Sequence, residues 1–150
     1  MRAVIQRVES ASVEVEHEVV GSCRTGYLVL LGVGHADSEA TADKLWKKIL
    51  NLRIFSDENG KTNRSLSDVD GGVLIVSQFT LFADCRHGNR PSFTDAAGAE
   101  LANSLYEYMC GLAVRDLGSE RVGHGIFGAD MRVSLVNDGP FTVVLDTDEL

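Results

Sequence analysis

Alternating apolar and polar positions open the chain. Residues 4–8 and 13–16 follow a period of two, which places successive side chains on opposite faces of a strand. Where this alternation stops, His17 and Glu18 predict a hairpin turn. Tyr27 to Val33 is a continuous apolar run between two glycines, so it predicts a strand that is buried on both faces.

A helical period follows. Asp37 or Ser38 is able to cap the first predicted helix, whose apolar residues recur at three- and four-residue steps: Leu45, Trp46, Ile49 and Leu52. Thr94 or Asp95 is the predicted cap of a second helix, whose apolar residues are spaced four, three and four apart: Leu101, Leu105, Tyr108 and Leu112.

Elsewhere the pattern returns to strands. Val73 to Phe82 predicts another buried strand, and a polar loop follows from Asp84 to Pro91. Two closing strands, Met131 to Val136 and Phe141 to Leu145, flank the tight segment 137–140. The elements predict a mixed α/β fold: one β-rich domain over residues 1–150, with a mixed sheet and two main helices.

Length and composition agree with a single domain. The 150 residues are 44% hydrophobic and 24% charged, close to the average of soluble globular proteins. No apolar run approaches the ~20 residues that span a bilayer. The opening residues, Met1 to Arg7, lack the apolar core of a signal peptide. We therefore expect a cytoplasmic protein without a membrane partner.

The cysteines and histidines are not spaced for a metal site. Cys23, Cys85 and Cys110 form no CxxC pair, and the four histidines add no short ligand spacing. We expect reduced, mostly structural thiols, no metal ion and no other cofactor.

Charge is distributed unevenly. The net charge of −8 argues against broad nucleic-acid binding, which depends on neutralising phosphates. Yet residues 44–64 hold only two acids, Asp57 and Glu58, beside six basic side chains: Lys44, Lys47, Lys48, Arg53, Lys61 and Arg64. This segment is either a local basic face that meets the end of an RNA or a solvated helix face.

Two motifs carry candidate chemistry. In the first, Ser77-Gln78-Phe79-Thr80, two hydroxyls and an amide interrupt an apolar strand, and burying such groups is costly unless each finds a partner. The second, residues 137–142, contains Gly139-Pro140, and an X-Pro bond is the kind that adopts the cis form at low cost. The alternatives are cross-strand hydrogen bonding for the first motif and a plain hairpin turn for the second.

Together, some sixty residues apart, the two motifs resemble the signatures of the D-aminoacyl-tRNA deacylase family. The resemblance runs over nearly the whole chain and includes residues 3–8, 53–57, 90–93, 127–131 and 134–140. It implies the fold of that family. It also implies hydrolysis of the ester bond of D-aminoacyl-tRNA, and of glycine mischarged on tRNA.

The resemblance further implies a homodimer whose active sites lie at the subunit interface. Gly139 and Pro140 would form a Gly-cisPro motif that enters the pocket of the other subunit, where its carbonyls hold the substrate's α-amino group. An L side chain would collide with this motif, whereas a D side chain would not, so selection works by exclusion. Arg7 would brace the Gly-Pro loop, and Phe127 and Met131 would line the pocket; ordinary strand and core roles remain open for all three.

Ser77, Gln78, Phe79 and Thr80 would form the opposite, catalytic wall. The N–H groups of Phe79 and Thr80 are candidates for an oxyanion hole. No His or Lys is near Thr80 in the sequence to activate it as a nucleophile. We therefore expect the terminal 2′-hydroxyl of the tRNA to help activate water.

His124 stands where the family usually has a small hydroxyl residue. It is either a titrating group near the site or a substitution at the rim without catalytic consequence. Two rival functions also stay open at this stage: a module that binds RNA ends through residues 44–64 without catalysis, and a threonine-dependent hydrolase of small esters or amides.

Overall fold

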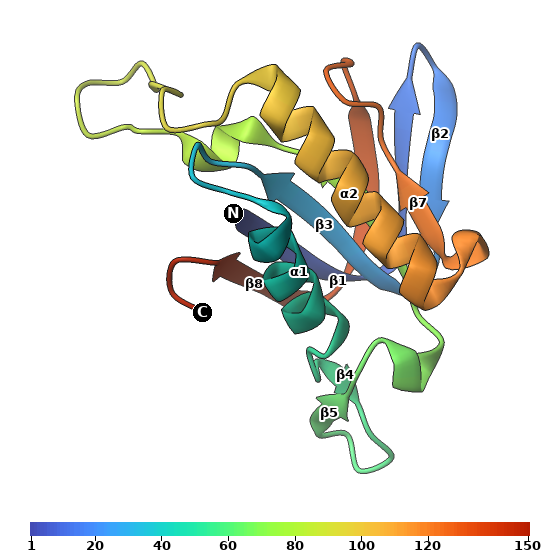
Figure 1. Ribbon diagram of the computed structural model, residues 1–150. Helices are drawn as coiled ribbons and strands as arrows, with labels where there is room; N and C mark the ends of the chain where they lie inside the picture. Colours follow the sequence, from blue (N-terminus) through green and yellow to red (C-terminus); the bar gives the residue numbers. More distant parts are fainter.

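A mixed six-stranded sheet forms the centre of the computed structural model, which describes residues 1–150 (Figure 1). The strand order is β2-β1-β3-β6-β7, and β8 pairs with β1 as well. These strands are β1 (Arg2–Val15), β2 (Glu18–Cys23), β3 (Gly26–Gly32), β6 (Gly72–Ser77), β7 (Val122–His124) and β8 (Arg132–Asp146). A separate hairpin consists of β4 (Phe55–Ser56) and β5 (Thr62–Arg64).

The sheet contains both parallel and antiparallel strand pairs. β1 pairs antiparallel with β2, β3 and β8, whereas β3–β6 and β6–β7 are parallel. The predicted mixed sheet is therefore confirmed. Parallel strands need a long crossover, and the chain between β3 and β6 supplies it with α1 (Glu39–Leu50) and the β4–β5 hairpin.

Both helices pack on the same face of the sheet (Figure 1). α1 and the longer α2 (Ala99–Leu117) lie against each other and share one apolar core with β1, β3 and β6. Ser38, one of the two predicted caps, is the N-cap of α1. Three short 3₁₀ helices complete the fold: η1 (Ser67–Val69), η2 (Phe79–Phe82) and η3 (Ser119–Arg121). Neither of the two α-helices has the length and apolar character that crossing a membrane requires.

The central strands are buried on both faces, as the apolar run 27–33 predicted. Tyr27, Val29 and Leu31 of β3 face the helices and belong to the main core. Leu28 faces the other way and packs with Leu74 of β6 in a smaller second core, which β1 closes. Cores on both faces explain why this strand shows no polar alternation.

The prediction of a strand from Val73 to Phe82 was wrong in its second half. β6 ends at Ser77, and Phe79–Phe82 form η2. The neighbouring strands explain this end. The last pair between β3 and β6 is Leu31 with Ser77, and the last pair between β7 and β6 is His124 with Ile75. Without partners for its ladder, the chain turns into a short 3₁₀ helix.

The second helix begins later than predicted. Its N-cap is Gly98 rather than Thr94 or Asp95. The preceding segment is held extended, because Ala97 donates its N–H to the carbonyl of Val33 and Ala96 bridges to Gly34. The buried face differs from the predicted one as well, since Leu101 is exposed and the core receives Tyr106 and Met109.

The two predicted closing strands are one. β8 runs through the segment 137–140, and both of its halves pair with β1. Residues 137–142 bulge outward opposite residues 6–8. The alternative of a plain hairpin turn, which Gly-Pro favours, is wrong, because continued pairing with the long β1 keeps both halves in one direction.

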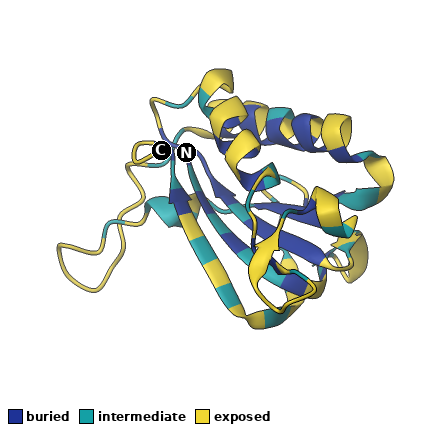
Figure 2. Cartoon of the chain, turned by 90° about the horizontal axis from the view of Figure 1, so that it is seen from below, coloured by how far each residue is buried: buried dark blue, intermediate teal, exposed yellow.

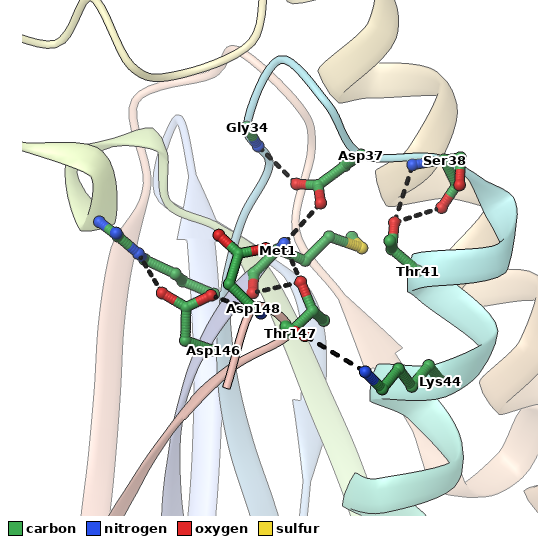
Figure 3. A network of polar contacts seen from close by, with 10 residues as sticks. Met1, Gly34, Asp37, Ser38, Thr41, Lys44, Asp146, Thr147 and Asp148 are labelled. Atoms are coloured by element: carbon green, nitrogen blue, oxygen red, sulfur yellow. Dashed lines mark hydrogen bonds and ion pairs between the residues drawn. The ribbon is translucent and has the colours of Figure 1, made fainter. Parts of the chain in front are cut away.

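The two ends of the chain meet beside the start of α1 (Figure 3). The ammonium group of Met1 donates to Asp37 Oδ1 and to Thr147 Oγ1, each at 2.5 Å. The other oxygen of Asp37 accepts the N–H of Gly34 at 2.6 Å. Lys44 of α1 reaches the carbonyl of Thr147 at 3.3 Å. This network fixes the loop between β3 and α1.

Replacing Ile49 tests the packing of α1. Ile49 is fully buried in the main core, so Ile49→Ala should lower the free energy of unfolding by about 2–5 kcal/mol. Lys48→Ala, on the exposed side of the same helix, should change it by less than about 0.5 kcal/mol. Urea unfolding at one fixed protein concentration measures both. Equal effects of the two substitutions would contradict the placement of this helix.

Candidate active site

A cavity of about 510 Å³ lies where β3 and β6 end. Its walls, mostly apolar, come from these strand ends, from the start of α2 and from residues 127–133. Five residues predicted from the sequence line it: Ser77, Gln78, Phe79, Phe127 and Met131. Two segments that are about fifty residues apart in the chain thus form one concave surface, which is typical of small-molecule sites.

The turn that follows β6 lies beside this cavity, and Ser77, Gln78 and Phe79 line it. Gln78 anchors it by donating its N–H to the carbonyl of Leu31 at 2.8 Å. Phe79 and Thr80 then begin η2. Because the first N–H groups of a helix have no acceptor within the helix, the N–H groups of Phe79 and Thr80 are not used in the hydrogen bonds of this turn.

Thr80 has no base beside it. Its hydroxyl oxygen accepts a hydrogen bond from the side-chain amide of Gln78. Thr80 itself does not line the cavity, whereas Phe79 does, with 58% of its surface exposed. An amide positions a hydroxyl but does not remove its proton, so this arrangement differs from an activated nucleophile.

Tyr106 is a site residue that the sequence did not reveal. It lies on the buried face of α2 and lines the cavity, and its hydroxyl is 2.9 Å from the carbonyl of Ile75 and 3.2 Å from that of Gly125. Its ring lies 6.1 Å from that of Phe127. Tyr106 therefore ties the end of β6 to the segment that carries Phe127. In the sequence, it is indistinguishable from a core residue.

The cavity contains little that titrates. Among the lining residues only Tyr106 and Asp130 are ionisable. Burial raises the pKa of Tyr106 far above its usual value, so its hydroxyl remains protonated. Asp130 is exposed at the rim. No group of three or more His, Cys, Asp and Glu side chains is placed to hold a metal ion.

Close packing leaves little room for a side chain at Gly125, beside Met131. A Cβ atom at Gly125 would come within 2.4 Å of the sulfur of Met131. Glycine at this position therefore allows Met131 to lie against the strand end. A neighbouring cavity of about 600 Å³ shares Met131, and its charged lining consists of three carboxylates and one guanidinium: Glu14, Glu16, Asp130 and Arg132.

The Gly139-Pro140 segment lies outside the cavity. Both residues are exposed, on the outward bulge of β8, and the bond between them is cis. Arg7 supports this bulge: its Nε donates to the carbonyl of Asp138 at 3.0 Å, and its guanidinium lies 4.7 Å from the ring centroid of Phe141. A further Arg7 hydrogen bond reaches the carbonyl of Ile54 at 2.6 Å.

The predicted site residues thus fall into two groups. Ser77 to Phe79, Phe127 and Met131 surround one cavity, whereas Arg7, Gly139 and Pro140 form a separate projection that does not contribute to it. His124 belongs to neither group. It is exposed, and its Nδ1 lies 2.9 Å from the carbonyl of Gly125.

Comparisons with known proteins agree on one family. Residues 4–146 match the sequence model of D-Tyr-tRNA(Tyr) deacylase. A relative from Roseiflexus sp. (strain RS-1), named D-aminoacyl-tRNA deacylase, is 57% identical and covers 98% of this chain and 94% of its own. Another of that name, from Thermosipho melanesiensis, is 53% identical and covers 100% and 99%.

Solved structures share the fold. One named c-Myc DNA Unwinding Element Binding Protein has a TM-score of 0.90 at 40% identity and covers 97% of this chain and 98% of its own. A probable eukaryotic D-amino acid tRNA deacylase has a TM-score of 0.85 at 17% identity, covers 96% and 97%, and shows likeness of fold. The match over residues 4–146 and the identity to full-length relatives place this chain in the D-Tyr-tRNA(Tyr) deacylase family.

Proposed function

We propose that this protein hydrolyses the ester bond of D-aminoacyl-tRNA, and of glycine mischarged on tRNA, to give the free amino acid and tRNA. The carrying observation is the cavity at the ends of β3 and β6, which is lined by Ser77, Gln78 and Phe79 of the first motif together with Phe127 and Met131. Membership of the family supports the same reaction.

In the proposed mechanism, backbone donors stabilise the transition state. The N–H groups of Phe79 and Thr80 point to the ester carbonyl and stabilise the oxyanion as water adds. Collapse of this intermediate breaks the bond to the ribose oxygen, which takes a proton and leaves with the tRNA. One such donor is typically worth about 10²–10³ in rate.

The base is assigned to the substrate. The lining contains no His, Lys or Cys, Tyr106 is held protonated, and the one carboxylate, that of Asp130, is exposed to solvent. We therefore assign the activation of water to the free hydroxyl of the terminal ribose. The protein contributes position and backbone hydrogen bonds.

Chiral selection is assigned to the partner subunit of a homodimer. Gly139 and Pro140 are exposed and lie apart from the cavity of their own chain. Inserted into the cavity of a second copy, their carbonyls would bind the α-amino group and leave no room for an L side chain. Selection by backbone atoms does not depend on which D side chain is attached.

The exposed surface of β8 supports the dimer. β8 pairs only with β1 and forms an edge of the sheet. Most of its residues are exposed or half-buried (Figure 2), and the exposed ones include Val136 at 52% and Val144 at 69%. An exposed edge strand with apolar side chains favours contact with a second chain.

The activity itself is tested with D-Tyr-tRNA and L-Tyr-tRNA of the same tRNA, with EDTA present throughout. We expect rapid loss of the D ester, while the L ester decays at the rate seen without protein. Inhibition by EDTA would show that a metal is needed. Equal cleavage of both esters would exclude the chiral filter, and cleavage of neither would exclude the enzyme.

Thr80→Ala separates backbone donors from a side-chain nucleophile. The N–H of residue 80 remains in this variant, so we expect a loss in kcat smaller than the about 10²–10³-fold that removal of one oxyanion donor costs. Single-turnover deacylation of D-Tyr-tRNA measures it. Complete loss in a folded variant would support the threonine-dependent hydrolase instead.

Subunit complementation tests the shared site. Ala102→Phe fills the cavity, and Gly139→Ala forces a Cβ to 2.2 Å from the Phe141 nitrogen. Each variant alone should be inactive. After unfolding and refolding together at equal amounts, about a quarter of the wild-type activity should return, because half of the dimers regain one complete site. If the refolded mixture forms dimers of normal mass but recovers no activity, the active site is not shared between subunits.

A further inference from the structure

The loop that follows η2 projects from the molecule. Residues 85–95 are all exposed, and the loop extends away from the sheet and both helices (Figure 1). Its base is closed by two backbone hydrogen bonds between Asp84 and Ser92, of 2.7 and 2.9 Å. We call residues 84–93 the arginine loop, after Arg86 and Arg90.

The base of the arginine loop lies at the mouth of the cavity. The ring of Phe93 packs edge-on against the ring of Phe79, with 5.0 Å between the centroids, and Phe79 lines the cavity. Just beyond the loop, the ring of His35 lies 2.7 Å from the carbonyl of Thr94. Whatever leaves the cavity past Phe79 therefore meets this loop first.

One cation of the loop is uncommitted. Arg86 donates to both oxygens of Asp84, at 2.8 and 2.7 Å, and the guanidinium holds the pKa of that carboxyl at about 2. These two charges offset each other. Arg90 is exposed and makes no hydrogen bond or ion pair with any other residue. It shares the loop tip with His87, and no acidic residue lies between them.

We propose that Arg90 binds a phosphate of the single-stranded 3′ end of the tRNA where the RNA leaves the cavity. This proposal rests on the proposed function. A guanidinium presents paired donors that match phosphate oxygens. On a chain of net charge −8, such a local contact draws the acceptor end toward the site without making the whole surface attractive to RNA.

The other basic segment, residues 44–64, is less suited to this role. Lys44 binds the carbonyls of Thr147 and Leu150, Arg53 binds the carbonyl of Asn63, and Arg64 binds that of Asp68. Half of its six cations are therefore engaged within the chain. Its β4–β5 hairpin also lies at the far end of the molecule from the arginine loop (Figure 1).

Paired substrates test the role of Arg90. D-Tyr-tRNA carries the phosphates, whereas D-tyrosyl-adenosine carries the same ester without any. Arg90→Ala should lower kcat/KM for D-Tyr-tRNA by about 3- to 10-fold, mainly through KM, and should make the slope of log kcat/KM against log salt shallower by ~0.7. Its kcat/KM for D-tyrosyl-adenosine should equal that of the wild type. Arg90→Lys should recover part of the loss.

Arg24→Ala is the matched control. Arg24 is another exposed arginine without a partner, in the turn between β2 and β3, at the opposite end of the β3–β6 pair. Its variant should behave as the wild type on both substrates. The proposal falls if Arg90→Ala behaves like Arg24→Ala. It also falls if Arg90→Ala changes the mass of the dimer, or if it lowers kcat/KM for D-tyrosyl-adenosine as much as for D-Tyr-tRNA. Failure of the proposed function would appear differently, as a wild type that cleaves neither substrate.

Discussion

The parallel pairing of β3 with β6 is the contact on which the other parts depend. Both strands are buried on both faces, and their ladder runs from Gly26 and Gly72 to Leu31 and Ser77. A parallel pair requires a crossover, and this one carries α1 over the face that α2 also covers. Where the ladder stops, the chain must find other partners. The cavity lies at that point, between the turn into η2 and the start of α2.

Much of this architecture follows from local pattern. The apolar run at 27–33 has no polar alternation because it has a core on each side, and the helix after Ser38 is marked by its cap and its periodicity. The motif at 77–80 could be recognised because its polar residues stand against an apolar background. Its resemblance to a known family then gave it a role that composition alone does not supply.

The errors share a physical cause, since each depended on partners distant in the sequence. Residues 78–82 have the apolar character of a strand, but β3 and β7 end before them. Thr94 has the chemistry of a helix cap, but the backbone of Val33 and Gly34 keeps the following residues extended. Tyr106 gained its place in the site from two carbonyls, at Ile75 and Gly125, that no local rule connects with it.

The bulge in β8 has a consequence for how this protein can change over evolution. Residues 137–142 face only residues 6–8, while the strand continues in register with β1 on either side. The ladder itself tolerates substitution of exposed side chains elsewhere on β8, because it consists of main-chain bonds, whereas Leu145 belongs to the main core. A deletion of one residue between Asn137 and Thr142 is different in kind, since it would either shorten the bulge and displace Gly139-Pro140 or shift one half of the strand by a register step. Descendants of this chain should therefore accumulate substitutions along β8 while the length of this segment stays fixed.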